Sequence, residues 1–484
     1  MKKLIAVATV LFFSYSHQIS AQNGIVSGSA SGLGLTGSNG ASLSGWEATL
    51  INPAALTTKS SSFPVDFTVF SGGGLIGNNN FTFNLYNTYF TGDEKGNPYD
   101  LEKDPAGKQE IISAFDPELK GFSKVQLIPL AVSYHTQSFG SFSFIIMTSG
   151  SGRISIPKDF AQRTFVAATE IGKTTKINDL VSKGMFRNEY ILGYASNVYL
   201  FRDLFDEVSI GGAFKLETGL AYGNLEIEKD EISTSSEGVI NHKFKYSGEL
   251  AGNDYFRAKM DSEFLVEDPG YLFTPAGYGL GFDLGISART NSGYKYFFSV
   301  TDLGWITWNK NTVSLHDENE ITITQYDPDR IGVTGNDYAD SLKNHYNPKR
   351  DESGFSTVLP TTINAGISFP IDKLPIIRNL YYPGKLTGHF SIHEGLNDEV
   401  GNTIIPRIAA GLDWMLFEKL DLRTGISFGG VETFNWGFGA GYRIMNFVQI
   451  DIGTANFHQL FLGDSKTKFS ASFNLRWFVP EPKF

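Results

Sequence analysis

The sequence contains no cysteine, and this absence excludes disulfide bonds and thiolate metal sites. For the same reason, the chain has no cysteine that could carry the lipid anchor of a lipoprotein. After the N-terminus, no continuous apolar run reaches the ~20 residues that a transmembrane helix takes. The net charge of −11 argues against nucleic acid as a partner, because phosphate binding needs clustered Lys and Arg.

The N-terminus has the order of a secretory signal peptide. Lys2 and Lys3 form a positive region, residues 4–15 form a short apolar core, and Ala21 is a small residue at a cleavage position. We therefore predict that residues 1–21 are removed and take no part in the fold. A buried N-terminal helix is the alternative.

The composition is rich in aromatic residues and glycine. Aromatic residues make up 14% of the chain, with 40 Phe and 21 Tyr, whereas hydrophobic residues reach only 41%. Glycine is abundant at 52 residues. A soluble enzyme of this size would normally show strong helical periodicity and fewer Phe. An exported chain of this composition is typical of a membrane β-barrel.

Bulky and small residues alternate with a period of two along many segments. In 277–289, one face carries Tyr278, Leu280, Phe282, Leu284 and Ile286, and the other carries glycines, Asp283 and Arg289. A soluble sandwich also alternates, but its strands average about five or six residues. The segments here run to roughly ten to fifteen residues, the length that a tilted membrane strand needs. We expect the bulky faces to point to lipid and the small or charged faces to the lumen.

Sixteen segments show this strand pattern. Short connections at every second junction predict periplasmic turns there, apart from the longer 372–384 connection, and they place 265–276, 310–356 and 396–402 outside the cell. The inserts 91–121 and 158–184 look partly helical. The predicted strands are 63–77, 80–90, 122–137, 140–157, 185–200, 207–228, 238–252, 277–290, 295–309, 357–371, 385–395, 403–417, 420–430, 433–446, 448–460 and 468–478.

The segment 22–62 is rich in Gly and Ser and is not strand-like. It is too long for a simple leader, so we predict that it folds into the barrel as a plug, with 63–484 as the barrel and its long loops. Within this segment, Pro53 can begin a short helical turn that Asn52 would cap. The fold class is therefore an all-β, transmembrane antiparallel β-barrel of about fourteen strands (12–16) with a short N-terminal plug.

The plug motif Asn52, Pro53 and Ala54 resembles the Asn-Pro-Ala segment of FadL/TodX-type outer-membrane proteins, which transport long-chain fatty acids and other hydrophobic compounds. The segments 277–285, 299–308 and 359–366 look like a Bacteroidota branch of that superfamily, named only as a domain of unknown function. The resemblance implies fourteen strands, an N-terminal hatch and a location in the outer membrane of a Gram-negative bacterium. It brings no ligand-binding residue to this chain.

Sequence motifs for catalysis or metal binding are weak. The glycines of 32–37 lack the strand and helix of a dinucleotide-binding turn, and the stretch from Asp327 lacks the Glu at position twelve of a calcium loop. His389 and His393 lie about 13 Å apart on one strand, too far to share a metal. We expect no enzyme activity, no cofactor and no catalytic or metal-binding residue.

One proline interrupts a good strand pattern in the N-terminal half. Pro129 lies between Ile128 and Leu130, and proline removes a hydrogen-bond donor from a strand ladder. In the transporters that the chain resembles, a kinked strand opens the wall sideways, so Ile128, Pro129 and Leu130 are the candidate lateral opening. A β-bulge that only adjusts curvature is the alternative. Pro406, near a strand end, fits a rim position.

Charged residues of both signs fall on the faces that we expect to point into the lumen. A selective water-filled pore would tend to carry rings of one sign. A mixed set more simply holds wall and plug together. The members of this lumen charge network are Asp283, Arg289, Arg407, Asp413, Asp421, Arg423, Arg443, Asp451 and Arg476.

Two classes of function remain open. The first is transport across the outer membrane of a hydrophobic small molecule, such as a fatty acid. The second is a scaffold or shuttle subunit for other envelope or secretion proteins. Both place the chain in contact with outer-membrane lipid, and an apolar pocket in the plugged lumen would favour transport.

Overall fold

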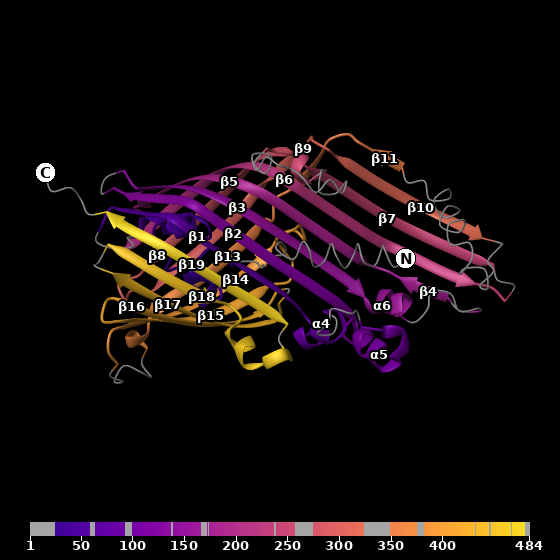
Figure 1. Cartoon of the computed structure of the whole chain (residues 1–484). Coiled ribbons are helices and arrows are strands. Elements are labelled where there is room, and N and C mark those ends of the chain that lie inside the picture. Colours follow the sequence, from indigo (N-terminus) through magenta and orange to yellow (C-terminus); the bar gives the residue numbers. More distant parts are fainter. Residues whose placement is uncertain are drawn as a thin grey trace.

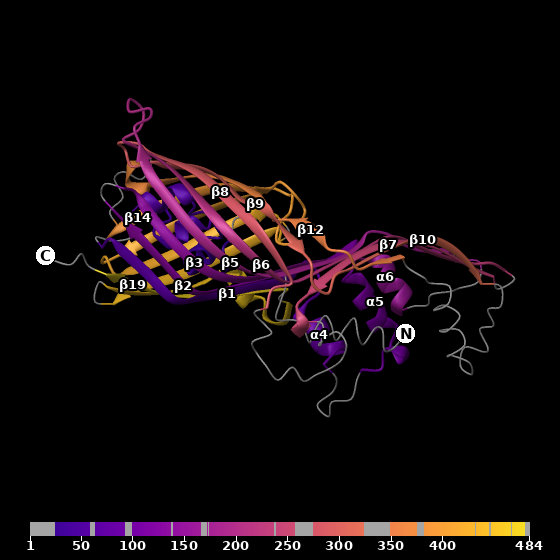
Figure 2. The ribbon, with the colours of Figure 1, turned by 90° about the horizontal axis from the view of Figure 1, so that it is seen from above.

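The computed structural model describes residues 25–58, 63–91, 99–136, 139–165, 172, 174–236, 239–256, 274–323, 349–374, 382–430, 432–444, 447–465 and 467–479. The expected signal peptide lies outside the described residues. The structure is an antiparallel barrel with chain inside it and, at one end, helices and a protruding sheet (Figures 1 and 2).

Fourteen strands close the barrel, and each is hydrogen-bonded to two antiparallel neighbours. The ring closes where Val65 of the first strand pairs with Val479 of the last. In ring order the strands are β1 (Val65–Asn78), β2 (Glu118–His135), β3 (Ser141–Pro157), β5 (Leu180–Val198), β6 (Glu207–Thr234), β8 (Gly277–Arg289), β9 (Lys295–Trp308), β13 (Thr362–Pro370), β14 (Lys385–Gly395), β15 (Arg407–Leu416), β16 (Leu420–Gly429), β17 (Phe434–Ile444), β18 (Val448–Thr454) and β19 (Lys468–Val479). The short β12 (Phe355–Val358) precedes β13 on the same neighbour, β9.

The predicted barrel class and strand range are confirmed, and two of the sixteen predicted strands are corrected. The segment 80–90 is the helix α4 (Phe83–Tyr89), because the hydroxyl of Thr82 accepts a hydrogen bond from the Leu85 amide and caps it. The segment 238–252 is a strand, β7 (Ile240–Gly252), but it lies outside the ring. The predicted strand 448–460 ends early, at Thr454, and continues as the 3-10 helix η6 (Phe457–Phe461).

The longer connections gather at the end of the barrel opposite Val65 and Val479, where transmembrane barrels carry their extracellular loops. Most of the predicted 310–356 loop falls outside the described residues. The helical inserts between strands at this end are η2 (Leu101–Lys103), α5 (Pro105–Ser113), α6 (Lys158–Phe165) and η7 (Gly463–Ser465). The opposite end has the short 3-10 turn η5 (Ile371–Lys373).

A sheet extends beyond the barrel at this same end, and we call it the outer sheet. It consists of β4 (Thr174–Ile177), residues 221–234 of β6, β7, β10 (Val313–Ile323) and β11 (Lys349–Asp351) (Figure 2). β6 therefore belongs to both the barrel and the outer sheet. It pairs with β8 up to Gly219 and with β7 from Ala221 onward. At this branch the ring of Trp308 packs so closely on Gly219 that a Cβ there would lie 2.4 Å from it.

The barrel wall has the two faces that the alternation predicts. The lipid side is apolar, and the lumen side is polar or small. Among the outward residues are Leu192, Phe214, Leu216, Phe282, Leu284, Phe298, Trp305, Ile408, Phe428, Trp436 and Phe438.

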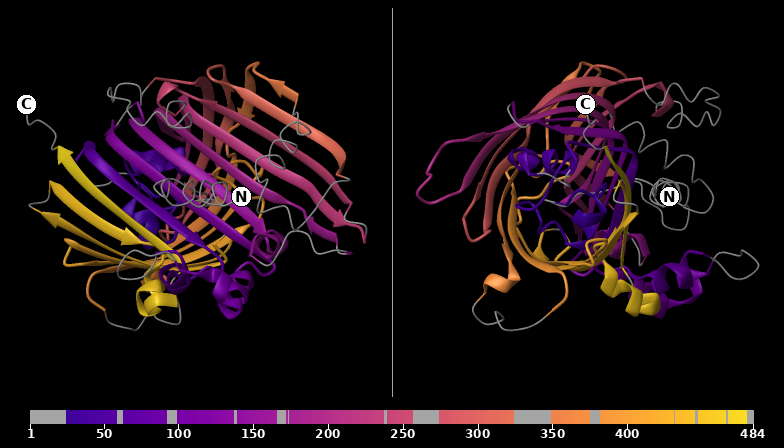
Figure 3. Two further views of the ribbon diagram at one scale, coloured as in Figure 1. Left: turned by 45° about the vertical axis from the view of Figure 1, so that its right-hand side comes forward. Right: turned by 90° about the vertical axis from the view of Figure 1, so that its left-hand side faces the viewer.

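The chain from 25 to 58 lies inside the barrel, and we call it the lumen segment. Its buried indigo ribbon is seen within the ring in the right-hand view of Figure 3. It forms α2 (Ala30–Gly34) against the wall at β16–β19, α3 (Trp46–Thr49) against β2 and β3, and η1 (Pro53–Thr57) against β5, β6 and β8. In the described residues, no helix is both long and apolar enough to cross a membrane.

Candidate ligand site in the barrel lumen

Glycines of the wall let the lumen segment pack backbone against backbone. A Cβ added at Gly73 would lie 2.1 Å from the carbonyl oxygen of Ser27, and one at Gly453 would lie 2.2 Å from that of Ala30. Any larger residue at these positions would push the lumen segment away from the wall.

The plug motif lies at the wall, but one of its expected roles is wrong. Pro53 does begin a turn, the 3-10 helix η1. The side chain of Asn52, however, makes no capping hydrogen bond; its amide donates instead to the hydroxyl of Ser287 in β8 at 2.8 Å. This partner belongs to the barrel wall and is distant in the sequence, so the residues next to Asn52 do not predict it. Ala54 lies against Gly211, where a Cβ would lie 2.6 Å from its amide nitrogen.

An apolar cluster joins the second half of the lumen segment to the wall. Trp46 and Leu56 are buried together with Ile128 and Ile145 of the neighbouring strands. These side chains form a packed apolar core between the lumen segment and the wall.

Arg476 ties the lumen segment to both ends of the closed ring. Its guanidinium donates to Glu47 of α3 at 2.8 Å and to Asp66 of β1 at 2.8 Å, and all three side chains are buried. Glu47 also accepts a hydrogen bond from Ser29 at 2.6 Å. The pair Arg476–Glu47 is a buried charged contact, which is costly to break from one side.

The structure divides the predicted lumen charge network into separate groups. Arg423 contacts Asp451 at 2.6 Å, Asp421 at 3.2 Å and Asp413 at 3.7 Å. Among the described residues, the other members make no ion pair with this group, although Gln449 links Arg443 to Asp451. Arg407 donates to the backbone of Thr36, Arg443 donates to Gln449, Arg289 pairs with Glu207 at the rim opposite the outer sheet, and Asp283 pairs with Lys215.

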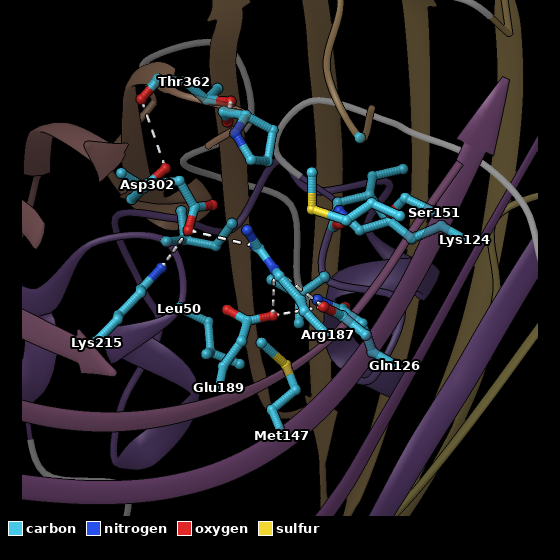
Figure 4. Close-up of a pocket in the computed structure, with 18 of the residues that line it drawn as sticks. Leu50, Lys124, Gln126, Met147, Ser151, Arg187, Glu189, Lys215, Asp302 and Thr362 are labelled. Carbon is cyan, nitrogen blue, oxygen red and sulfur yellow. Dashed lines mark hydrogen bonds and ion pairs between the residues drawn. The ribbon is translucent and has the colours of Figure 1, made fainter. Parts of the chain in front are cut away.

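A cavity opens between the lumen segment and the loop after β14. Its volume is ≈ 70 Å³, room for a few water molecules and well below the range of about 300–1,000 Å³ that is usual for small-molecule sites. Figure 4 shows polar and apolar side chains interleaved there, with Glu189 beside Leu50 and Met147. The apolar lining is Ile25, Val26, Leu50, Ile51, Met147, Met185, Pro360 and Val400, and the polar lining includes Lys124, Gln126, Ser149, Ser151, Arg187, Glu189, Lys215, Thr301, Asp302, Thr362 and Asn364.

A charged group forms one side of this cavity, and sequence analysis identified only Asp283 of it. Lys215 lies 2.7 Å from Asp302 and 2.9 Å from Asp283, and Arg187 lies 3.2 Å from Glu189 (Figure 4). The alternation alone indicates that these side chains face the lumen. It gives no sign that they meet, because they come from β5, β6, β8 and β9.

The predicted lateral opening lies at a bulge. The register of β2 against β3 shifts between Leu127 and Leu130, and β1 has a matching shift between Thr68 and Phe70. Ile128 points inward and is fully buried in the apolar cluster, whereas Pro129 and Leu130 are exposed on the lipid side. The wall is closed here, with Ile128 packed close to Gly28 of the lumen segment. Pro406 directly precedes β15, at the rim.

One hydrogen-bonded chain has the order of a catalytic triad. Ser391 lies 2.8 Å from Nε2 of His393, whose Nδ1 lies 2.7 Å from Asn364. A working triad needs room for a substrate at the hydroxyl. Here the carbonyl oxygen of Gly37 occupies that place, 3.1 Å from both the hydroxyl and Nε2, and Ser391 and His393 are fully buried. This arrangement binds the lumen segment to the wall.

The model of a family described as a family of unknown function, DUF5723, matches residues 53–454. A search of curated proteins gives no match. Several solved barrels are similar in structure at low identity. A Pseudomonas aeruginosa FadL homologue is 13% identical, with a TM-score of 0.44 over 95% of this chain and 98% of its own. The P. putida toluene transporter TodX is 10% identical, with a TM-score of 0.43 over 96% and 100%. The Ralstonia pickettii toluene transporter TbuX is 11% identical, with a TM-score of 0.40 over 92% and 98%.

Proposed function

The chain belongs to the family of unknown function DUF5723, and we propose that it is an outer-membrane barrel that binds hydrophobic small molecules in its lumen and passes them across the membrane. The observation that carries this proposal is the cavity above the lumen segment. Its lining offers apolar side chains to a hydrocarbon body and polar side chains to one fixed polar group, and the lumen segment would have to move aside to widen it for a ligand.

Three features together support a location in the outer membrane. The first 21 residues have the pattern of an export signal. The ring of strands closes on itself, so no strand edge faces lipid, and its outer surface is apolar. A barrel of this kind is stable in the outer membrane of a Gram-negative bacterium.

In this proposal residues 22–62 act as the plug and the rest of the mature chain as the barrel. A ligand would enter from the extracellular end, where the loop after β14 borders the cavity through Val400 and Gly401. It would leave sideways near Ile128, Pro129 and Leu130, because the bulge already weakens the ladder there. A sideways exit spares an apolar molecule the passage through the polar lumen.

Filling the cavity tests this function. We expect Met185→Trp to reduce uptake of radiolabelled palmitate or naphthalene by at least about tenfold, because the indole would occupy the cavity. Met415→Trp is the matched control, since Met415 lies at the periplasmic end of β15 and does not line the cavity. Heat-modifiable migration on gels verifies that both variants fold. Uptake by Met185→Trp equal to that of the control would reject the cavity as the route.

A scaffold for another envelope protein is the second candidate. The outer sheet favours it, because it projects beyond the barrel and takes no part in the cavity (Figure 2). Deleting the distal part of the outer sheet distinguishes the two candidate functions. Transport through the cavity would continue without it, whereas a scaffold would lose its partner.

A further inference from the structure

Three carboxylates from three strands meet beside the cavity. One oxygen each of Glu189 (β5), Glu217 (β6) and Asp302 (β9) lies within 4.8 Å of the others. Glu189 and Glu217 are fully buried, and Asp302 is partly buried. Carboxylates so close together repel one another unless a cation lies among them.

The positive charges beside these groups do not balance them. Arg187 and Lys215 face four acids, since Asp283 shares Lys215 with Asp302. Two negative charges are therefore in excess. Lys124 also lines the cavity, but its ammonium donates to the carbonyl oxygen of Ile25 at 3.0 Å. Even when Lys124 is counted, one negative charge remains without a counterion.

Of the three carboxylates, Glu217 has the poorest set of hydrogen-bond and ion-pair partners. Among the described residues, neither of its oxygens accepts a hydrogen bond, although the side chain is completely buried. Its nearest ion-pair contact is Nε of Arg187 at 3.6 Å, too long for a hydrogen bond. A buried carboxylate without a hydrogen bond is strongly unfavourable, and a cation held at its oxygens would relieve this cost.

We propose that Glu189, Glu217 and Asp302 bind a calcium ion. Calcium takes oxygen ligands at about 2.3–2.6 Å, so two oxygens on one ion lie at most about 5 Å apart, as these do. It accepts irregular geometry and completes its shell with water, which the adjoining cavity can supply. Magnesium would demand a near-ideal octahedron and shorter distances.

Arg187 competes for the same carboxylates. Its guanidinium contacts Glu189 at 3.2 Å, Glu217 at 3.6 Å and Asp302 at 3.6 Å, so it lies against all three. The ion would draw the carboxylates inward and displace this side chain. Calcium affinity should therefore rise when Arg187 loses its charge.

Calorimetric titration of the metal-stripped, folded barrel with calcium chloride tests the site. We expect one saturable site in the wild type, loss of affinity by tenfold or more in Glu217→Gln, and tighter binding in Arg187→Gln. Glu228→Gln is the matched control, because Glu228 is an exposed acid of the outer sheet that pairs with Lys245. Its calcium binding should equal that of the wild type.

Three outcomes would overturn the proposal. They are no saturable binding by the wild type, wild-type affinity in Glu217→Gln, or weaker binding in Arg187→Gln. If Glu217→Gln does not fold, Glu189→Gln and Asp302→Asn carry the same test. The measurement reads calcium directly, so it stands or falls independently of whether the cavity transports a hydrophobic molecule.

Discussion

The guanidinium of Arg476, in the last strand of the wall, donates a 2.8 Å hydrogen bond to the carboxylate of Glu47 in the lumen segment. Replacing Glu47 with Gln should weaken this link, because Arg476 keeps Asp66 but loses its second charged partner. We expect the free energy of unfolding to fall by about 1–3 kcal/mol and single-channel conductance to rise. Conductance equal to that of the wild type would show that this ion pair does not hold the barrel closed.

A wall glycine gives a second test of the lumen segment. Gly73→Ala would place a Cβ 2.1 Å from the carbonyl oxygen of Ser27, whereas Gly184→Ala has its nearest neighbour at 3.8 Å. We expect the first variant to lose about 1–3 kcal/mol of stability, as overpacked sites do, and the second to melt like the wild type. Equal melting temperatures would mean that the lumen segment yields freely at this contact.

Pro129 tests the lateral opening. Pro129→Val restores a backbone donor to β2, so we expect the bulge to tighten and the melting temperature to rise. If ligands leave here, naphthalene uptake should fall several-fold while surface assembly stays normal. Raised stability with unchanged uptake would identify the bulge as a feature of curvature alone.

The absence of cysteine permits a clean test of orientation. A single thiol introduced as Asp464→Cys lies on the exposed η7 at the predicted extracellular end, and Leu204→Cys lies in the exposed turn between β5 and β6 at the other end. A membrane-impermeant maleimide should label only the first in intact cells. Labelling of only the second would reverse the orientation.

The outer sheet should loosen in acid. Asp230 contacts Arg163 of α6 at 2.7 Å and His242 of β7 at 2.8 Å. Burial alone would raise the pKa of Asp230, but the hydrogen bonds from His242 and Arg163 outweigh it and hold the pKa below 3.8. Because the folded pKa is depressed, the contact stabilises the fold above the unfolded pKa, near 3.8, and is lost as pH falls through the lower folded value.

Proteolysis of the α6 region from pH 6 to pH 3 measures this effect. We expect cleavage of the wild type to increase toward the acid end. Asp230→Asn should be cleaved faster at neutral pH and should show a flatter pH profile. A wild-type profile without an acid rise would exclude Asp230 as the group that secures α6.

Alternation along the chain was enough to predict the barrel, its lumen faces and most of its strands. The bounds of β14 agree with the prediction at both ends, and those of β9 differ by one residue. The aromatic stretch 80–90 was misassigned because its Phe and Tyr suit a strand, whereas a single hydroxyl cap, Thr82, starts a helix there. β7 was placed in the ring because alternation cannot show which neighbour a strand pairs with.

The candidate site was harder to predict, for a related reason. Periodicity tells which face a residue occupies, but the register between strands decides which side chains meet. Glu189 pairs across the ladder with Glu217, and this pairing depends on the bulge between Phe186 and Arg187. Asp302 joins them from β9. Its backbone has a positive φ, which the sequence does not predict.

β6 continues without a break from the opposite rim of the barrel to the tip of the outer sheet, over 28 residues, a length of about 90 Å at about 3.3 Å per residue. Its near half touches the lumen segment where Gly211 meets Ala54, and its far half pairs with β7 in the outer sheet. A continuous hydrogen-bonded strand resists stretching. A pull or tilt applied to the outer sheet should therefore be transmitted along β6 to the wall beside Ala54, so that a single strand couples the outer sheet mechanically to the lumen segment.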